Sequence, residues 1–281
     1  MLTQAYMQNA FAVGGLVAIV SGVVGFFVVL RAASFAAHAL AQVGFAGAAG
    51  AVLIGVDPLW GLLAFALLGA AGIGVLGERD SGRDASTALV MTAALGTGAL
   101  FLVLNRSYAT EAFSLLFGTI VGISRAEVVE MAILVTVALA LIALLYRPLL
   151  FATVNPDAAR ARGIPMRRLN VAFLACLAIA AAATVPTVGT LLIFALLVAP
   201  PAAAVALTDR PSAALVLAVV LNLACCWTGI ALAYYLALPI GFLIAVLAAL
   251  VYLAARTVRG YRDRRGSKGA RAGGRTVPLP S

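Results

Sequence analysis

The sequence predicts an all-α polytopic membrane protein with about eight or nine membrane-spanning helices. Of its 281 residues, 64% are hydrophobic and only 10% are charged, whereas soluble domains carry about 25% charged residues. The charges gather in short clusters between apolar runs of about 20 residues, the length that a helix needs to cross roughly 30 Å of hydrocarbon. The runs are continuous and rich in Ala, Leu and Val, so they predict helices rather than the alternating strands of a barrel.

Nine apolar runs follow one another along the chain, and each is expected to cross the membrane as one helix. They cover residues 10–30, 36–56, 59–77, 88–104, 128–146, 171–185, 188–207, 213–236 and 239–255. A shorter apolar piece, 112–123, fits either a re-entrant helix or a helix on the membrane surface. The count stays at eight or nine because both 10–30 and 112–123 are open to another interpretation.

Arginine placement predicts the orientation. The loop 147–168 carries five arginines, and the segment 256–281 carries seven arginines and one lysine. Lys and Arg gather on cytoplasmic loops, and the four spans between these segments place both on one side. We expect a multi-pass protein of the cell membrane, with a transmembrane domain over 1–255, a disordered basic cytoplasmic tail over 256–281 and the N-terminus outside. The tail can touch anionic lipid; nucleic acid is not an expected partner, because no aromatic residues alternate with the charges after Tyr261.

The loop 147–168 also contains the signals of a short helix. Asn155-Pro156-Asp157 is typical of a helix start, and Gly163-Ile164-Pro165 of a helix stop. We expect a capped helix over about 155–163 on the aqueous side, built from Asn155, Pro156, Asp157, Arg160, Arg162 and Gly163. A polar helix in such an apolar chain predicts a membrane protein that is worked by a partner.

The second run holds the main polar residues within a span. His38 and Gln42 are four residues apart, so they share one helix face. Polar groups inside a membrane are costly and are candidates for function. The pair either lines a polar path, where His38 is a candidate metal contact, or satisfies local hydrogen bonds near the end of the span. Gly44, Gly47 and Gly50 follow on the same helix and allow either close packing or space for a substrate.

Two later runs contain further interruptions. Pro200-Pro201 lies within 188–207, so that helix is expected to kink or break. Broken helices at membrane depth often line transport cavities, although a purely structural kink fits as well. Asn222 lies within the eighth run, where we expect it to form a hydrogen bond between helices.

The chain offers few residues for enzyme chemistry. It has one histidine, and no acidic residue lies deep in an apolar run. It has no phosphate-binding loop of the GxxxxGK type, so any ATP that drives the protein is bound by another chain. The three cysteines lack CxxC spacing, which argues against a zinc site. We expect a transport subunit that is not an enzyme and binds no cofactor of its own.

Several stretches, in order over roughly residues 8–255, resemble the permease subunits of the metal-ion (zinc, manganese or iron) ABC importers. They are VLRAASFAAHALAQ (29–42), RDA (83–85), LFG (116–118), NPDAARARGIP (155–165), VGTLL (188–192), LVAP (197–200), YY (234–235) and LPIG (238–241). The resemblance implies a type II importer-like fold. It also implies a dimer of two permease copies with the path between them, two cytoplasmic ATP-binding subunits and an extracytoplasmic solute-binding protein. The helix around 156–162 would be the coupling helix that fits a groove in the ATPase.

The chain departs from the family pattern at the path. The family commonly has aspartate where His38 stands and histidine where Gln42 stands, a pair thought to hold the ion. Here the imidazole of His38 is a good ligand and the amide of Gln42 a poor one. Metal coordination at this position and the identity of the cargo therefore stay open. A lone imidazole mildly favours zinc over manganese. Phe242 also stands where the family often has proline.

Two other functions remain open from the sequence. One is a permease for an iron–siderophore or cobalamin-like cargo, whose subunits share the coupling loop but usually have about ten spans. The other is a secondary transporter or membrane scaffold that needs no ATPase. Inverted repeats would favour a secondary carrier, and none is convincing in this sequence.

Overall fold

Every regular element in the described part of the chain is a helix. The computed structural model describes residues 5–76, 83–105, 118, 123–236 and 238–272. Its helices are α1 (Ala5–Leu30), α2 (Ser34–Leu53), α3 (Pro58–Leu76), α4 (Arg83–Leu104), α6 (Arg125–Val154), α7 (Pro156–Ala161), α8 (Met166–Val188), α9 (Thr190–Leu207), α10 (Pro211–Leu236) and α11 (Ile240–Ala272). Apart from Gly118 and Ile123, the piece 112–123 lies outside the described residues, so its two interpretations both stay predictions.

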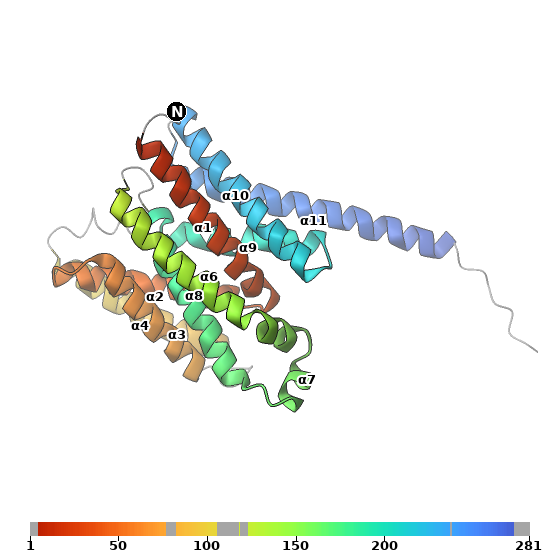
Figure 1. Cartoon of the computed structure of the whole chain (residues 1–281), viewed down its shortest axis with the longest axis horizontal. Coiled ribbons are helices and arrows are strands. Elements are labelled where there is room, and N and C mark those ends of the chain that lie inside the picture. Colours follow the sequence, from red (N-terminus) through yellow and green to blue (C-terminus); the bar gives the residue numbers. More distant parts are fainter. Residues whose placement is uncertain (1–4, 77–82, 106–117, 119–122, 237, 273–281) are drawn as a thin grey trace, which may run out of the picture.

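The predicted spans agree with these helices. Eight helices among the described residues are long and apolar enough to cross a membrane, and α9 is a shorter apolar helix. All nine apolar runs therefore fold as helices, and the predicted fold class is confirmed. Helix α11 runs on past the expected span to Ala272 and projects away from the bundle (Figure 1). The helix thus continues into the segment expected as a tail, whose disorder stays a prediction.

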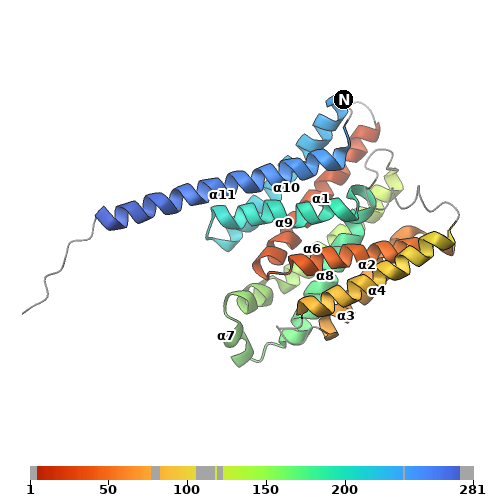
Figure 2. The ribbon, with the colours of Figure 1, turned by 180° about the vertical axis from the view of Figure 1, so that it is seen from behind.

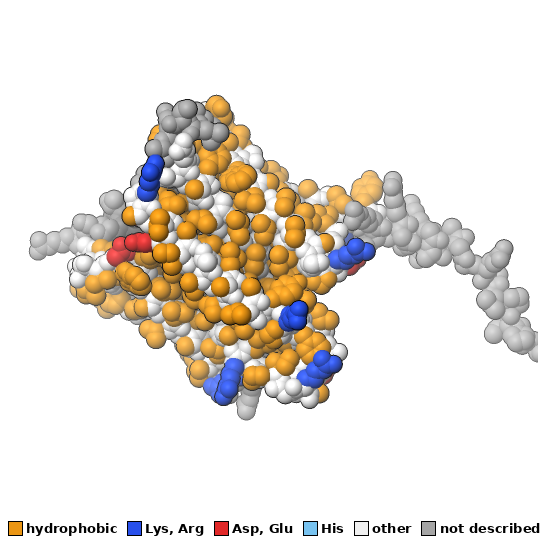
Figure 3. Space-filling model, in the orientation of Figure 1, with side chains coloured by type: hydrophobic (Ala, Val, Ile, Leu, Met, Phe, Trp, Pro, Cys, Tyr) orange, Lys and Arg blue, Asp and Glu red, His pale blue; other side chains and the backbone are white. Residues whose placement is uncertain are grey.

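The bundle has an inner and an outer group of helices. Of the residues in their spanning windows, 78% are buried in α2 and 72% in α8, against 11% in α4 and 22% in α6. Seen from the two sides, α2, α3 and α4 lie together, and α1, α9, α10 and α11 form the other group (Figure 2). On the face that Figure 3 shows, hydrophobic side chains predominate and the charged ones lie toward its edges, as expected where lipid replaces water.

Helix α2 packs against α3 and α4 through small residues. A Cβ atom on Gly47 would lie 2.1 Å from the Gly61 carbonyl oxygen of α3, and one on Gly44 would lie 3.0 Å from Leu62. A Cβ on Gly50 would lie 2.8 Å from the ring of Phe101 on α4. The glycines of the second run therefore serve helix packing, one of the two interpretations that the sequence left open.

The two prolines of α9 do not break it. Helix α9 is continuous from Thr190 to Leu207 with Pro200 and Pro201 inside it, so the break is wrong, and the kink, the other expectation for this site, stays a prediction. Pro201 has no N–H for the carbonyl of Leu197, and that oxygen instead faces Gly25 of α1, where a Cβ would lie 2.4 Å away. The helical chain is interrupted before α9 instead, at Gly189, whose φ of +87° separates α8 from α9.

The connections follow from local capping chemistry. Asp57 accepts a hydrogen bond from the Leu59 N–H ahead of α3, at 2.8 Å. Ser124 and Glu127 form a reciprocal capping box at the start of α6, with hydrogen bonds of 3.2 and 2.7 Å. Proline occupies the first position of α3, α7 and α10, where its missing N–H costs no hydrogen bond.

Candidate functional site

The polar face of α2 points away from its glycine face. Gln42 is one turn from His38, whereas Gly47 is nine residues from His38 and so half a revolution away. The His38 ring packs edge-on against Phe194 of α9, with ring centroids 5.3 Å apart. The Gln42 side chain is buried at 7% exposure. The structure thus places both predicted residues on the side of α2 that faces α9.

One imidazole nitrogen in this region is left without a hydrogen bond. The Nδ1 atom of His38 is buried and has no hydrogen-bond partner within the described residues. The hydrogen-bond alternative for His38 is therefore not met at this atom. An orphaned buried nitrogen has a desolvation cost, and a passing ligand can offset it.

A hydroxyl on α9 extends this polar region. Thr190 lies one turn before Phe194, and its buried Oγ1 atom likewise has no partner in the described part of the chain. Helices α2 and α9 run in opposite directions (Figure 2). Gln42 lies one turn after His38, and Thr190 lies one turn before Phe194. Because the two helices run in opposite directions, both residues lie on the same side of the His38–Phe194 contact. Sequence reasoning did not single out Thr190, although it belongs to the VGTLL motif at 188–192.

Asn222 behaves differently from the prediction. Its Nδ2 group donates to the Ala218 carbonyl of its own helix at 3.2 Å, and its Oδ1 atom is buried without a partner among the described residues. The expected hydrogen bond between helices is therefore wrong for the residues described. The Asn222 amide bonds to its own helix, because the carbonyl of the preceding turn lies within reach of the side chain.

The polar face of α2 cannot enclose a metal ion by itself. Within the described ranges, no three His, Cys, Asp or Glu side chains come together as a metal site. His38 supplies one imidazole nitrogen and Gln42 a weak amide oxygen. Two such donors leave most of a divalent ion's coordination positions to water or to other groups. Contact of His38 or Gln42 with a metal ion therefore stays a prediction.

The predicted short helix is present as α7 at one end of the bundle (Figure 1). The Asn155 side chain accepts from the Ala158 N–H at 3.0 Å, and Pro156 occupies the first position of the helix. At the other end Gly163 has φ +75°, the left-handed conformation that glycine adopts without strain. Both capping signals in the sequence are thus realised in the structure.

Helix α7 is anchored on one side and open on the other. Ala159 is fully buried, and the Arg162 guanidinium stacks over the ring of Phe151 in α6 at 5.1 Å. Asp157 and Arg160 form an ion pair of 3.0 Å, and their side chains are 91% and 60% exposed. An exposed pair of this kind adds little stability, so these charges are available to another surface.

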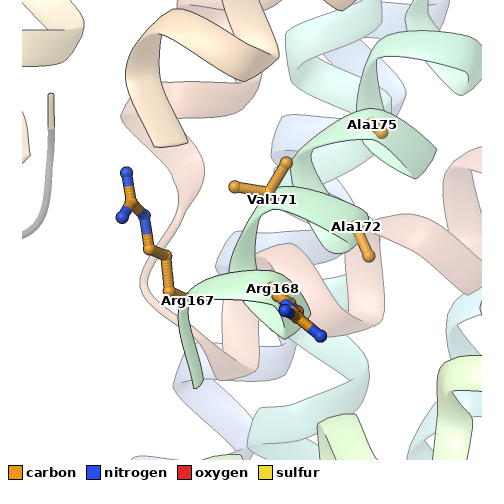
Figure 4. Close-up of a pocket in the computed structure, with 5 residues that line it drawn as sticks. All are labelled: Arg167, Arg168, Val171, Ala172 and Ala175. Carbon is orange, nitrogen blue, oxygen red and sulfur yellow. The ribbon is translucent and has the colours of Figure 1, made fainter. Parts of the chain in front are cut away.

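A basic groove of about 450 Å³ lies at the start of α8, the helix that follows α7 in the chain. It is lined by Arg167, Arg168, Val171, Ala172 and Ala175 (Figure 4). Both arginines extend from the first turn of α8, while the other lining residues form an apolar wall. The positive charge of this end of the bundle therefore reaches beyond the capped helix itself.

Comparison with known proteins decides the family. The sequence pattern of the ABC 3 transport family matches residues 3–259. The chain belongs to the ABC 3 transport family. The resemblance drawn from short motifs is thereby confirmed, and with it the assignment to a multi-pass membrane permease.

Three proteins illustrate the likeness of this ABC 3 family permease to its relatives. The manganese transport system membrane protein MntC of Halalkalibacterium halodurans is 29% identical over 75% of this chain and 72% of that protein. The chelated iron transport system membrane protein YfeC of Yersinia pestis is 28% identical over 89% and 85%. The solved structure of PsaBC from Streptococcus pneumoniae in complex with Fab has a TM-score of 0.80 at 25% identity, covering 90% and 91% of the two chains.

Proposed function

We propose that this chain is the membrane-spanning subunit of an ATP-driven importer that moves a divalent metal ion, namely manganese, iron or zinc. The observation that carries the proposal is the family match over residues 3–259. The names of the relatives supply manganese and iron as cargo. Zinc is retained because a lone imidazole is a better ligand for zinc than for manganese.

The division of labour follows from what the sequence contains. No phosphate-binding loop occurs in the 281 residues, so in this proposal cytoplasmic ATP-binding partners hydrolyse ATP. An extracytoplasmic solute-binding protein delivers the ion, and a second copy of the chain completes the path. The permease holds no resident cofactor, and the metal ion is cargo.

In this proposal α7 is the coupling helix. A part that transmits force must be rigid, exposed on one side and joined to spanning helices on the other. Caps at both ends give α7 its rigidity, Asp157 and Arg160 give it an exposed polar surface, and it lies directly between α6 and α8. Movement of an ATPase bound to α7 then acts on two spans at once.

The path runs along the polar face of α2 in this proposal. His38 offers the ion one nitrogen donor, and Gln42 and Thr190 offer oxygen atoms one turn further on. The absence of a carboxylate among these three residues keeps binding weak. Weak binding suits transport, because an ion that binds too tightly cannot leave.

The cargo is tested by whole-cell metal content. A strain that lacks the chain and the same strain with the gene restored are compared by mass spectrometry for manganese, iron and zinc. We expect the content of one metal to fall in the deletion strain and to recover only when the ATP-binding partner is active. Equal contents of all three metals in both strains would overturn the proposal.

The coupling role is tested by changing the exposed charges of α7. Asp157→Ala and Arg160→Ala should reach the membrane at normal levels, because the exposed pair contributes only about 0–1 kcal/mol to stability. Both variants should lose capture of the ATP-binding subunits and metal uptake, at least tenfold. Arg210→Ala, an exposed arginine in the α9–α10 loop, is the matched control and should retain both. Normal capture and uptake in the α7 variants would contradict the coupling assignment.

A further inference from the structure

Arg31 stands at the end of α1, in a tight turn that leads into α2. The Ala33 N–H donates to the Val28 carbonyl at 2.8 Å, and the Ala32 N–H donates to the Val29 carbonyl at 3.2 Å. Ala32 has φ +50° and is the only described residue besides glycine with positive φ. This pattern is the Schellman ending of a helix, with Arg31 as its last half-helical residue. The turn is therefore fixed by its own backbone.

The Arg31 side chain reaches two other helices. Its Nη1 atom donates to Thr153 Oγ1 of α6 at 3.4 Å, and its Nη2 atom donates to Asn170 Oδ1 of α8 at 3.3 Å. The guanidinium also stacks over the ring of Phe173, 5.2 Å from its centroid. One planar cation thus links three helices at the end of the bundle that carries α7.

These partners flank α7 on both sides in the chain. Thr153 lies two residues before Asn155, which caps α7, and Asn170 lies in the second turn of α8, which follows it. The Thr153 hydroxyl gives its own proton to the Leu149 carbonyl at 2.6 Å, so it can only accept from Arg31. Arg31 therefore contacts the end of α6 and the start of α8, the two segments through which any displacement of α7 must pass.

The same turn controls the start of α2. Only Ala32 and Ala33 separate Arg31 from α2, and the Ala37 N–H donates back to the Ala33 carbonyl at 3.0 Å. His38 is the next residue after Ala37. A displacement applied to Arg31 is therefore carried within about one helical turn to the first polar residue of α2.

We propose that Arg31 is a positioning residue that transmits the movement of α7 to the His38-bearing start of α2. This role rests on the proposed function, in which an ATPase binds α7. Arginine suits the task because its rigid, flat guanidinium can donate to two acceptors and stack on a ring at the same time. Lysine offers a single flexible ammonium and cannot hold all three contacts.

The test uses the permease reconstituted in vesicles with its ATP-binding subunits and its solute-binding protein. ATP hydrolysis and import of manganese, iron or zinc are measured together for wild type, Arg31→Gln, Arg31→Lys and Arg210→Gln, which removes an exposed arginine from the α9–α10 loop. We expect Arg31→Gln to bind the ATPase and hydrolyse ATP within twofold of wild type, while ions imported per ATP fall at least tenfold. Arg31→Lys should be intermediate, and Arg210→Gln should match wild type.

A second measurement follows the transmission itself. Hydrogen exchange is compared with and without ATP at α7 and at the first turn of α2. In wild type both should change on adding ATP, and in Arg31→Gln only α7 should change. If Arg31→Gln does not accumulate, Thr153→Val removes one acceptor with little change of shape and should lower ions imported per ATP in the same direction.

Three outcomes would overturn the role of Arg31. The first is an unchanged number of ions per ATP in Arg31→Gln, or in Thr153→Val where that variant replaces it. The second is an equal loss in Arg210→Gln, which would make the effect one of charge. The third is an Arg31→Gln variant in which hydrolysis and import fall together, which is the signature of a merely structural role. A wild-type complex without ATP-dependent import would instead refute the proposed function, and the role of Arg31 with it.

Discussion

The crossing of α2 and α3 predicts a large effect of a single methyl group. In Gly47→Ala the new Cβ would lie 2.1 Å from the Gly61 carbonyl oxygen and 2.5 Å from the Phe65 Cβ. Neither atom can rotate away, because one is backbone and the other is fixed to it. Ordinary contact begins at 3.4 Å, so α3 must retreat by roughly 1 Å. A gap of this size forfeits about a quarter to a half of each contact along the crossing.

The expected loss is about 3 kcal/mol, the upper end for overpacking a core. Alanine regains about 1 kcal/mol because it is a better helix former than glycine. The net loss is then about 2 kcal/mol, which corresponds to a fall of roughly 4–8 °C in the unfolding midpoint, at the 2–4 °C per kcal/mol found for domains of similar size.

The assay is the fraction of monodisperse protein left after heating in detergent, at one fixed heating time. Gly96→Ala is the control, since nothing lies within 4 Å of a Cβ placed there, and its midpoint should stay or rise. Gly61→Ala should resemble Gly47→Ala, because its Cβ would lie 2.2 Å from the Gly47 carbonyl oxygen. The double variant should cost less than the sum. A Gly47→Ala midpoint within 1 °C of the Gly96→Ala midpoint would refute the packing argument.

Two further outcomes are expected. Ala32→Gly should raise the midpoint by roughly 2–4 °C, because an alanine in the left-handed region costs about 1 kcal/mol and the exposed Ala32 side chain loses nothing on removal; a lower midpoint would contradict the role of the turn. His38→Ala should lower uptake of the cargo about tenfold, the equivalent of about 1.4 kcal/mol, while Phe194→Leu, which keeps the imidazole, should lower it less. Unchanged uptake of zinc, manganese and iron in His38→Ala would remove that residue from the path.

Much of the fold could be predicted because membrane helices are recognisable from their composition as continuous apolar runs. A continuous apolar run has no stable alternative in lipid, so each run had to become a helix. Capping signals are equally local, and Asn155, Pro156 and Gly163 therefore located α7 before the structure did. Bounds were less certain, as α6 and α11 show by extending past the apolar runs that predicted them.

What the sequence could not supply was the neighbour of each polar residue. Asn222 was expected to bond to another helix, yet its side chain donates to the Ala218 carbonyl of its own helix. Thr190 gave no signal by residue type, because a threonine normally bonds to its own helix and only the structure leaves its Oγ1 atom unpartnered within the described residues. In the sequence Arg31 is one position of the stretch 29–42 without a role of its own, and its contacts lie 122 and 139 residues away.

Pro200 and Pro201 show the same limit for backbone chemistry. A proline leaves the carbonyl four residues earlier without its helical N–H, and the effect on the helix depends on whether the neighbouring residues leave room for that oxygen. Gly25 of α1 provides the room for the Leu197 oxygen, so α9 passes through the prolines without a break.

The composition of α2 also bears on how easily the helix can shift. Its fourteen buried residues include eight alanines and two glycines, which have no side-chain torsion that must be reset when a neighbour moves. Large interlocked side chains would instead have to change rotamer at each step, and packed interiors resist that. The methyl groups and bare backbone of α2 have no such rotamer to change, so the cost of a small shift comes from the side chains of its neighbours. The helix that carries His38 thus has few side-chain torsions of its own to reset when it moves, and the extent of its movement depends on the contacts at its ends.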